Sequence, residues 1–390
     1  MDSSREKNSN TRVRIAAMLP RTRPPYRADH VGSLLRPKYL LDARERKARG
    51  EIDRAALRAV EDRAIAEAVV FQQEIGLRAV TDGEYRRTYF HIDFLEQLEG
   101  VTVSGGIGTK FHTAKGEVDF APPRLAVTAK LRHVRPIQVE DFNYLKSVVK
   151  RGTPKVCIPS PTMVHFRGGR GAISKDAYPD LDGFFEDLAA CYRKELAALG
   201  AAGCSYVQLD DTNLAYLCDP KQREAAQQRG EDPEALPHTY ARLINASIRD
   251  KPKDMTIGIH LCRGNFRSAW VAEGGYDPVA QALFKELAVD GIFLEYDDAR
   301  SGGFAPLRFV PKGKTIVLGL ISSKLGELEP KDAIKRRIDE AARYMPLEQM
   351  CLSPQCGFSS TVHGNDISVE NQRAKLALVR DVAREVWGEA

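Results

Sequence analysis

The chain has 390 residues, 43% of them hydrophobic and 28% charged, which are the proportions of an ordinary globular protein. Its net charge of +5 is small for this length, and many arginines stand beside acidic residues, so we expect no nucleic-acid partner. Apolar runs stay well below the roughly 20 residues that a membrane helix needs, so we expect no membrane span. Seven cysteines, with no signal peptide before them, lead us to expect a cytoplasmic protein.

Residues 1–25 are polar and rich in arginine, and we expect them to form a disordered tail. From residue 26 onward, short β-like runs alternate with amphipathic stretches whose apolar residues have helical spacing. The predicted strands are 26–32, 77–82, 155–159, 205–210, 256–260, 291–295, 315–320 and 349–352. The clearest predicted helices are 55–76, 181–200, 278–290, 330–344 and 369–387.

Eight strand–helix alternations predict an α/β protein with one (β/α)8 TIM barrel over residues 26–390. An open doubly wound sheet is the alternative, but it usually has a glycine-rich phosphate turn after its first strand, and residues 31–34 form no such turn.

Residues 100–133 are rich in glycine and β-formers, so we expect a β-rich hairpin insertion there. Residues 214–237 are polar, and we expect an irregular segment. Both insertions are candidate lids over one face of the barrel.

Metal-ligand residues follow several of the predicted strands, at the barrel face where this fold builds its active sites. His260 and Cys262 are two residues apart in an extended run, so their side chains share a face. Glu295 ends the sixth strand, and Cys356 follows the eighth. Nitrogen, oxygen and sulfur ligands in this mixture suit Zn²⁺, so we predict a zinc site on these four residues. We expect the other five cysteines to be structural.

Motifs along the chain resemble one known family. The matching pieces, in order, are His30-Val31-Gly32-Ser33, Thr81-Asp82-Gly83-Glu84, Gln208-Leu209-Asp210, His260-Leu261-Cys262, Glu295 and Pro354-Gln355-Cys356-Gly357. With them, the chain resembles the catalytic barrel of the cobalamin-independent methionine synthase family. It is most similar to the short single-barrel members, which include epoxyalkane:coenzyme M transferase-like proteins.

The resemblance spans about residues 28–388 and implies roles for individual residues. It implies the same four zinc ligands that the chemistry of the strand ends predicts. It also places Ser33, Glu84 and Asp210 where the family holds the amino-acid part of homocysteine. Carboxylates suit an ammonium group, and a hydroxyl with a backbone N–H suits a carboxylate. We expect no catalytic residue beyond the metal site.

The sequence departs from the family pattern at two places. Residues 162–167, after the third strand, lack the tryptophan that stacks on the folate pterin. Residues 319–324, after the seventh strand, lack the histidine near the reacting groups. Methylfolate and homocysteine are therefore implied less firmly than a zinc–thiol site.

The predicted ligand set indicates thiol chemistry, because zinc deprotonates a bound thiol and two thiolates with one carboxylate keep the bound sulfur nucleophilic. We therefore expect a zinc-dependent S-methyltransferase, similar to 5-methyltetrahydropteroyltriglutamate–homocysteine methyltransferase. Its partners would be a small thiol and an alkyl donor, either methylfolate, a methylcorrinoid or an epoxide. Thiol addition to an epoxide is the alternative reaction, and a non-catalytic zinc-binding regulatory barrel is the second alternative. Candidate anchors for an acidic substrate group are Arg167, Arg170, Arg263 and Arg267.

Overall fold

The computed structural model describes residues 20–106, 108–113, 116–121 and 123–390. Most of the predicted tail, residues 1–19, lies outside this part of the chain. Arg21 belongs to the predicted tail, yet its backbone N–H donates to Glu389 and its guanidinium donates to Thr315, each over 2.8 Å. Contacts with the barrel therefore begin before the expected boundary at residue 26.

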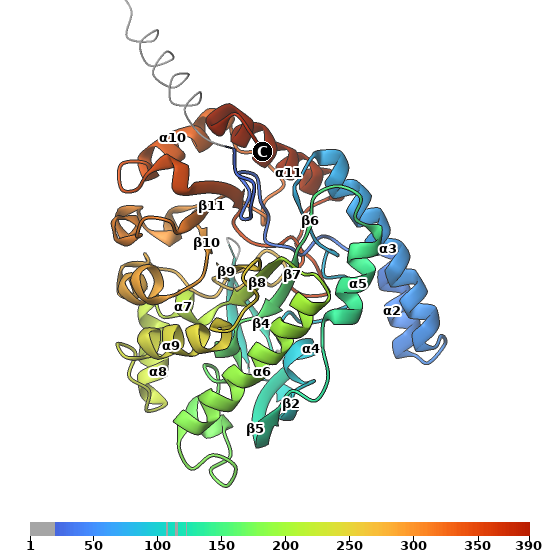
Figure 1. The fold of residues 1–390 in the computed structure, drawn as a ribbon, viewed down its shortest axis with the longest axis vertical. Helices are drawn as coiled ribbons and strands as arrows, with labels where there is room; N and C mark the ends of the chain where they lie inside the picture. Colours follow the sequence, from blue (N-terminus) through green and yellow to red (C-terminus); the bar gives the residue numbers. More distant parts are fainter. Residues whose placement is uncertain (1–19, 107, 114–115, 122) are drawn as a thin grey trace, which may run out of the picture.

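A parallel sheet in chain order forms most of the barrel wall (Figure 1). Its strands are β7 (Val156–Pro159), β8 (Tyr206–Asp211), β9 (Thr256–Leu261), β10 (Gly291–Glu295), β11 (Thr315–Ile321) and β12 (Met350–Pro354). The short strand β1 (Ala79–Val80) pairs with β6 (Thr153–Pro154), which leads into β7. Ala28 forms a parallel bridge with Leu352 of β12 and closes the ring from the other side. The fold is the predicted (β/α)8 barrel.

The first predicted strand, residues 26–32, is wrong as a full strand, because it contributes only this bridge to the sheet. Two of its carbonyl groups accept hydrogen bonds from side chains in the barrel interior. Lys155 Nζ donates to the carbonyl of His30, and Gln208 Nε2 donates to the carbonyl of Val31 over 2.6 Å. Side-chain donors thus replace the ladder that would pair this segment with β1.

Long helices surround the sheet, and four of the five predicted helices are confirmed to within a few residues. These are α3 (Arg54–Ile75), α6 (Leu181–Ala201), α10 (Lys331–Ala341) and α11 (Val369–Trp387). Further helices are α2 (Lys38–Ala48), α4 (Ile92–Leu95), α5 (Val139–Val148) and α9 (Leu236–Ile248). No helix in the described ranges is long and apolar enough to cross a membrane.

The predicted helix 278–290 is wrong in type. The chain forms a 3-10 turn, η3 (Asp277–Val279), and then a π-helical turn, η4 (Gln281–Glu286). Asn245 of α9 accepts from the backbone N–H of Ala288 and donates to the carbonyl of Glu286, so it captures the backbone at the end of the turn. A neighbouring helix therefore ends this segment early, which periodicity cannot reveal.

The two insertions differ in how they fold. In the first, β2 (Glu99–Gly106) pairs with β5 (Pro123–Arg132), and β3 (Thr109–Thr113) pairs with β4 (Gly116–Phe120), both antiparallel, as the β-rich prediction requires.

The second insertion contains α7 (Asn213–Tyr216) and α8 (Pro220–Gln228), so the prediction of an irregular segment is wrong. Asp219 caps α8 by accepting from the backbone N–H of Lys221 over 2.8 Å. The polar composition reflects the exposure of α8, in which Ala226 is the buried residue.

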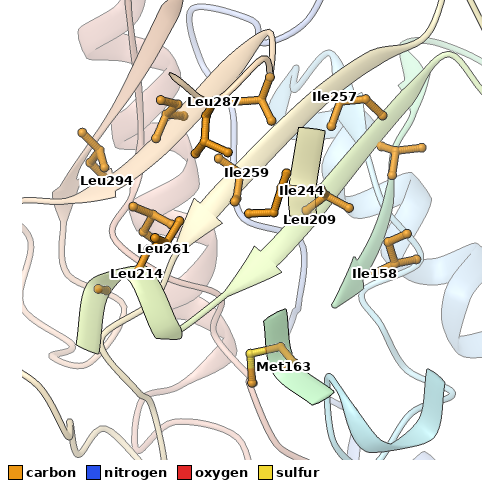
Figure 2. Close-up of a cluster of buried hydrophobic side chains, with 14 of the residues drawn as sticks. Ile158, Met163, Leu209, Leu214, Ile244, Ile257, Ile259, Leu261, Leu287 and Leu294 are labelled. Carbon is orange, nitrogen blue, oxygen red and sulfur yellow. The ribbon is translucent and has the colours of Figure 1, made fainter. Parts of the chain in front are cut away.

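Alternation along the strands divides apolar packing from the chemistry of the barrel interior. Ile257, Ile259 and Leu261 of β9 point outward, where Figure 2 shows them beside Leu209 of β8 and Ile244 of α9. The intervening positions of β9 therefore face the interior. A separate interior cluster consists of Val31, Phe293, Val317 and Cys351.

Candidate metal and substrate site

The four predicted metal ligands meet at the carboxyl ends of the strands. His260 lies near the end of β9, Cys262 follows that strand, Glu295 ends β10 and Cys356 follows β12. Their ligand atoms all lie within 4.8 Å of one another, and all four side chains are buried. The pairing of Leu294 with Leu261 brings the next residues of these two neighbouring strands, Glu295 and Cys262, side by side.

The donor atoms of this group fit a metal ion. Both ring nitrogens of His260 and Oε2 of Glu295 are buried, and in the described part of the chain no hydrogen bond from outside the group of four candidate ligands satisfies them. Such atoms are uncommon, because buried polar groups are normally paired. The sulfurs of Cys262 and Cys356 lie 3.4 Å apart. That distance is too long for a disulfide and near the roughly 3.8 Å that separates two thiolates on one tetrahedral zinc ion.

The two thiols are electrostatically coupled. Hydrogen bonding to Cys262, supported by His260, holds the pKa of Cys356 well below its usual range. The same hydrogen bond, together with burial, raises the pKa of Cys262. The pair therefore favours one thiolate and one thiol, and binding a cation between the sulfurs would release the remaining proton.

Backbone and charged groups orient the Glu295 carboxylate. Its Oε1 accepts from the backbone N–H of Arg263 over 3.0 Å, and its Oε2 lies 3.5 Å from Nη2 of Arg300. Arg300 also donates to Asp297 over 2.9 Å, so its charge is shared between two carboxylates. These contacts hold Glu295 in place and leave Oε2 without a full hydrogen bond.

One pocket is lined by three of the four candidate metal ligands and by the predicted substrate residues. Its lining includes His260, Cys262 and Cys356 together with Ser33, Glu84 and Asp210. The sequence prediction thus brought together residues that share a single cavity, although a substrate role for any of them stays a prediction.

Two carboxylates form the acidic part of this pocket. Glu84 has φ of 58°, a left-handed conformation that is uncommon outside glycine, and it accepts from Nε of Arg87 over 2.5 Å. Burial, followed by the charge of Glu84, raises the pKa of Asp210 to about 7. A carboxylate oxygen of Glu84 lies within 4.8 Å of one of Asp210. Two negative charges at this distance repel each other, so a cation between them is favourable. An ammonium group has the required charge and donors.

Ser33 connects its own turn, which follows the first barrel segment, to the loop that carries Cys356. Its hydroxyl accepts from the backbone N–H of Ser359 over 3.3 Å, and its carbonyl accepts from the backbone N–H of Phe358 over 3.0 Å. The turn and the ligand loop are therefore held as one unit.

Several residues at or near the pocket were missed by sequence reasoning. Cys157, expected to be structural, does not line the pocket but groups with Glu84 and Asp210, with its sulfur within 4.8 Å of their carboxylate oxygens. The missed lining residues include Arg87, Tyr89, Phe90, His91, Phe111, Tyr216, Asn265 and Phe266. Arg87 had a signal, since it lies three residues after Glu84, whereas Phe111 is brought in by a distant insertion.

The four candidate arginines have different surroundings. Arg167 is the one of the four that lines the pocket. Arg170 instead donates to the carbonyls of Ile173 and Tyr178, each over 2.7 Å. Arg263 is fully buried and does not line the pocket, and Arg267 is exposed. Arg167 is therefore the arginine in position to reach an acidic group on a substrate.

The first insertion covers the pocket, in agreement with its prediction as a lid. The backbone of His112 in β3 exchanges two hydrogen bonds with Trp270, of 2.6 and 3.0 Å. The neighbouring Phe111 packs its ring 5.6 Å from that of Phe266, and both rings line the pocket. The hairpin is thus fastened across the mouth of the barrel.

Comparison with known proteins identifies the family. The model of the cobalamin-independent synthase catalytic domain matches residues 29–385, a span that contains all four candidate ligands. The chain belongs to the cobalamin-independent methionine synthase family. Its single barrel is a methionine synthase-like catalytic domain.

Relatives share this length and architecture. The YxjH protein of Bacillus subtilis (strain 168) is 48% identical over 93% of this chain and 95% of its own length. A structure of the putative vitamin B12-independent methionine synthase of Listeria monocytogenes is 39% identical, with a TM-score of 0.75 over 95% of this chain and 100% of that one. The methionine synthase of Pyrococcus abyssi is 24% identical and covers 84% of both chains.

Proposed function

We propose that this protein is a zinc-dependent thiol alkyltransferase that methylates homocysteine or a related small thiol in methionine biosynthesis. One observation carries the proposal: four buried ligand atoms lie within 4.8 Å of one another, and three of the residues that supply them line a pocket together with Glu84 and Asp210. A ligand set with two thiolates favours thiol activation over the activation of water for hydrolysis.

The residues of the site divide the work of binding. His260, Cys262, Glu295 and Cys356 would hold Zn²⁺, which would lower the pKa of a bound substrate thiol and leave the resulting thiolate nucleophilic. Glu84 and Asp210 would pair with the substrate ammonium, and Ser33 would donate to its carboxylate.

Cover over the pocket strengthens these charged contacts. Phe111 and Phe266 shield it from solvent, and a lower local dielectric makes each ionic interaction stronger. The same shielding would protect the reacting thiolate from water.

Methyl transfer is favoured over epoxide opening by family membership and by the methionine synthases among the relatives. Methylfolate and a methylcorrinoid are both candidate donors. Residues 162–167 contain no tryptophan to stack on a pterin. In this segment, residues 161–164 form a 3-10 turn, and Phe166 packs on Tyr216. Arg167 is placed to pair with an acidic donor group, or with the sulfonate of a thiol in the alternative reaction with an epoxide.

Zinc-edge X-ray absorption with added thiols tests the proposal. Homocysteine should add one sulfur to the zinc shell of the purified protein, and a sulfonated thiol should do so if the epoxide reaction is correct. Turnover assays with methylfolate, methylcobalamin and an epoxide then identify the donor. A zinc shell that ignores every thiol, with no turnover, would favour the regulatory barrel.

A further inference from the structure

The loop after β12 places three hydroxyl side chains close to Cys356. In the sequence, Ser359, Ser360 and Thr361 follow this candidate ligand by three to five residues. Two of the hydroxyls have partners within the loop, since Ser359 donates to the carbonyl of Thr361 over 2.9 Å and Thr361 contacts Nδ1 of His363 over 3.2 Å. The hydroxyl oxygen of Ser360 instead lies 3.5 Å from the sulfur of Cys356. Ser360 is therefore the member of this set that contacts the metal site.

Backbone contacts fix the position of Ser360 in the loop. Its carbonyl accepts from Nη1 of Arg87 over 2.8 Å, and Arg87 in turn pairs with the carboxylate of Glu84 over 2.5 Å. Two residues further on, the backbone N–H of Val362 donates to the carbonyl of Thr88 over 3.0 Å. The turn that carries Glu84 thus holds the loop on which Ser360 lies, and the hydroxyl is kept beside the sulfur.

The direction of this hydrogen bond follows from the charge of the sulfur. A thiol can donate as well as accept, whereas a thiolate can only accept. Metal binding requires Cys356 as the thiolate, so in the loaded site the proton of the bond must come from Ser360. In the described ranges, the sulfur is the hydrogen-bond partner of this hydroxyl. Because sulfur is larger than oxygen, 3.5 Å is an ordinary length for an O–H···S bond.

A donor at this position would offset the charge of the loaded site. Zn²⁺ with two thiolates and one carboxylate has a formal charge of −1, and all four ligand side chains are buried. Negative charge in a buried site is costly unless donors or cations surround it. A hydroxyl that donates to one of the thiolates stabilises the charged form of that sulfur, which is the form that binds a metal.

We propose that Ser360 is a positioning residue of the metal centre, with its hydroxyl donating to the thiolate of Cys356 and thereby strengthening metal binding. The inference rests on the proposed function in one respect, the binding of zinc to the four ligands. Arg87 holds the carbonyl of Ser360 and also pairs with Glu84, so one guanidinium connects the proposed ammonium site to a metal ligand.

Zinc affinity of full-length variants, measured by competition with a chromophoric chelator, tests this role. Ser360→Ala removes the hydroxyl and keeps the carbonyl that accepts from Arg87, so the loop should hold its position. Zinc binding should weaken about 10- to 100-fold, the usual effect of removing a group that supports a metal ligand. Ser360→Thr keeps a hydroxyl and should bind zinc within a fewfold of the wild type.

Cobalt(II) in place of zinc gives a second readout, because charge transfer from thiolate to cobalt absorbs in the near ultraviolet. A hydrogen bond lowers the energy of the sulfur lone pairs, so the charge-transfer band of a hydrogen-bonded thiolate lies at shorter wavelength. Ser360→Ala should therefore move this band to longer wavelength, and Ser360→Thr should restore it. A hydroxyl that only supports the loop would leave the band in place.

Ser353→Ala is the matched control. Ser353 is a buried serine of β12, three residues before Cys356, and its hydroxyl donates to the carbonyl of Pro354 over 2.9 Å. The zinc affinity and the cobalt band of this variant should equal those of the wild type.

The outcomes separate this inference from the proposed function. A wild-type protein that binds neither metal would overturn both. A wild-type protein that binds zinc, with a Ser360→Ala variant unchanged in zinc affinity or in the cobalt band, would overturn the role of Ser360 and leave the proposed function standing. Equal changes in Ser353→Ala would do the same, because the effect would then not depend on the contact with the sulfur.

Discussion

A methyl group at Gly357 would lie 2.0 Å from the hydroxyl oxygen of Ser33, far inside the contact distance of any two nonbonded atoms. Gly357 follows the candidate ligand Cys356, and Ser33 belongs to the proposed substrate turn. The loop that carries the candidate ligand and the proposed substrate turn therefore touch without an intervening side chain.

Gly357→Ala should displace Ser33 and weaken both the fold and the binding of an amino-acid thiol. Overpacking of this kind costs about 1–3 kcal/mol of unfolding free energy. Urea unfolding and homocysteine titration measure the two effects. Gly303→Ala is the control, since a methyl group there meets nothing within 4 Å. Unchanged homocysteine affinity in Gly357→Ala would show that Ser33 does not contact the substrate.

Cys356→Ser should lose most of its zinc, because a neutral hydroxyl replaces a thiolate ligand. Cys157→Ser should retain zinc, because the sulfur of Cys157 donates to the carbonyl of Val31 and groups with Glu84 and Asp210 instead of with the four ligands. Metal analysis of the purified variants measures both. Zinc loss in Cys157→Ser with full retention in Cys356→Ser would place the metal at the other cluster.

Glu84→Ala should weaken homocysteine binding by about 1.5–3 kcal/mol, the scale of a hydrogen bond to a charged group. Zinc content should not change, since Glu84 is outside the ligand set. A thiol without an amino group, such as 3-mercaptopropionate, is the control and should bind both proteins equally. Equal losses for the two thiols would mean that Glu84 supports the pocket without pairing with the ammonium.

His30 should make the protein sensitive to acid. Burial lowers its pKa to about 4, whereas the unfolded residue titrates near 6.5. Its contribution is therefore complete above pH 6.5 and is lost as the pH falls from 6.5 through 4, up to about 3 kcal/mol.

Urea unfolding at pH 7 and pH 4.5 measures this sensitivity. His30→Asn should lose less stability than the wild type between these two values. An identical loss in both proteins would assign the acid sensitivity to other groups.

Much of the fold and the candidate ligand set was predictable because both depend on local patterns. Alternation in β9 places His260 on the inner face and Ile259 on the outer face, and strand ends of a barrel converge by topology. The pocket lining was less predictable. Phe111 arrives from an insertion, and Arg87, which follows β1, holds the loop that carries Ser360. Such facts arise from packing between distant segments.

The first barrel segment failed as a predicted strand for a similar reason. Its alternating sequence is typical of a strand, but Lys155 and Gln208 supply hydrogen bonds from inside the barrel. Whether side-chain or backbone donors bind these carbonyl groups depends on which distant residues pack beside them, and the alternation of the sequence does not show this.

That side-chain closure has a consequence for how the barrel fluctuates. Next to β1, the first segment is held by a backbone bond from Leu34 to Gly83 and by a few side chains, whereas β8, β9 and β10 share longer ladders. The free energy of local opening is lower where fewer backbone bonds must break, so amides near Ser33 should exchange with solvent before those of β9 and β10. The proposed substrate turn, together with the Cys356 loop to which it is bonded, would then open more readily than β9 and β10, so thiols could enter and leave while His260 and Glu295 keep their positions.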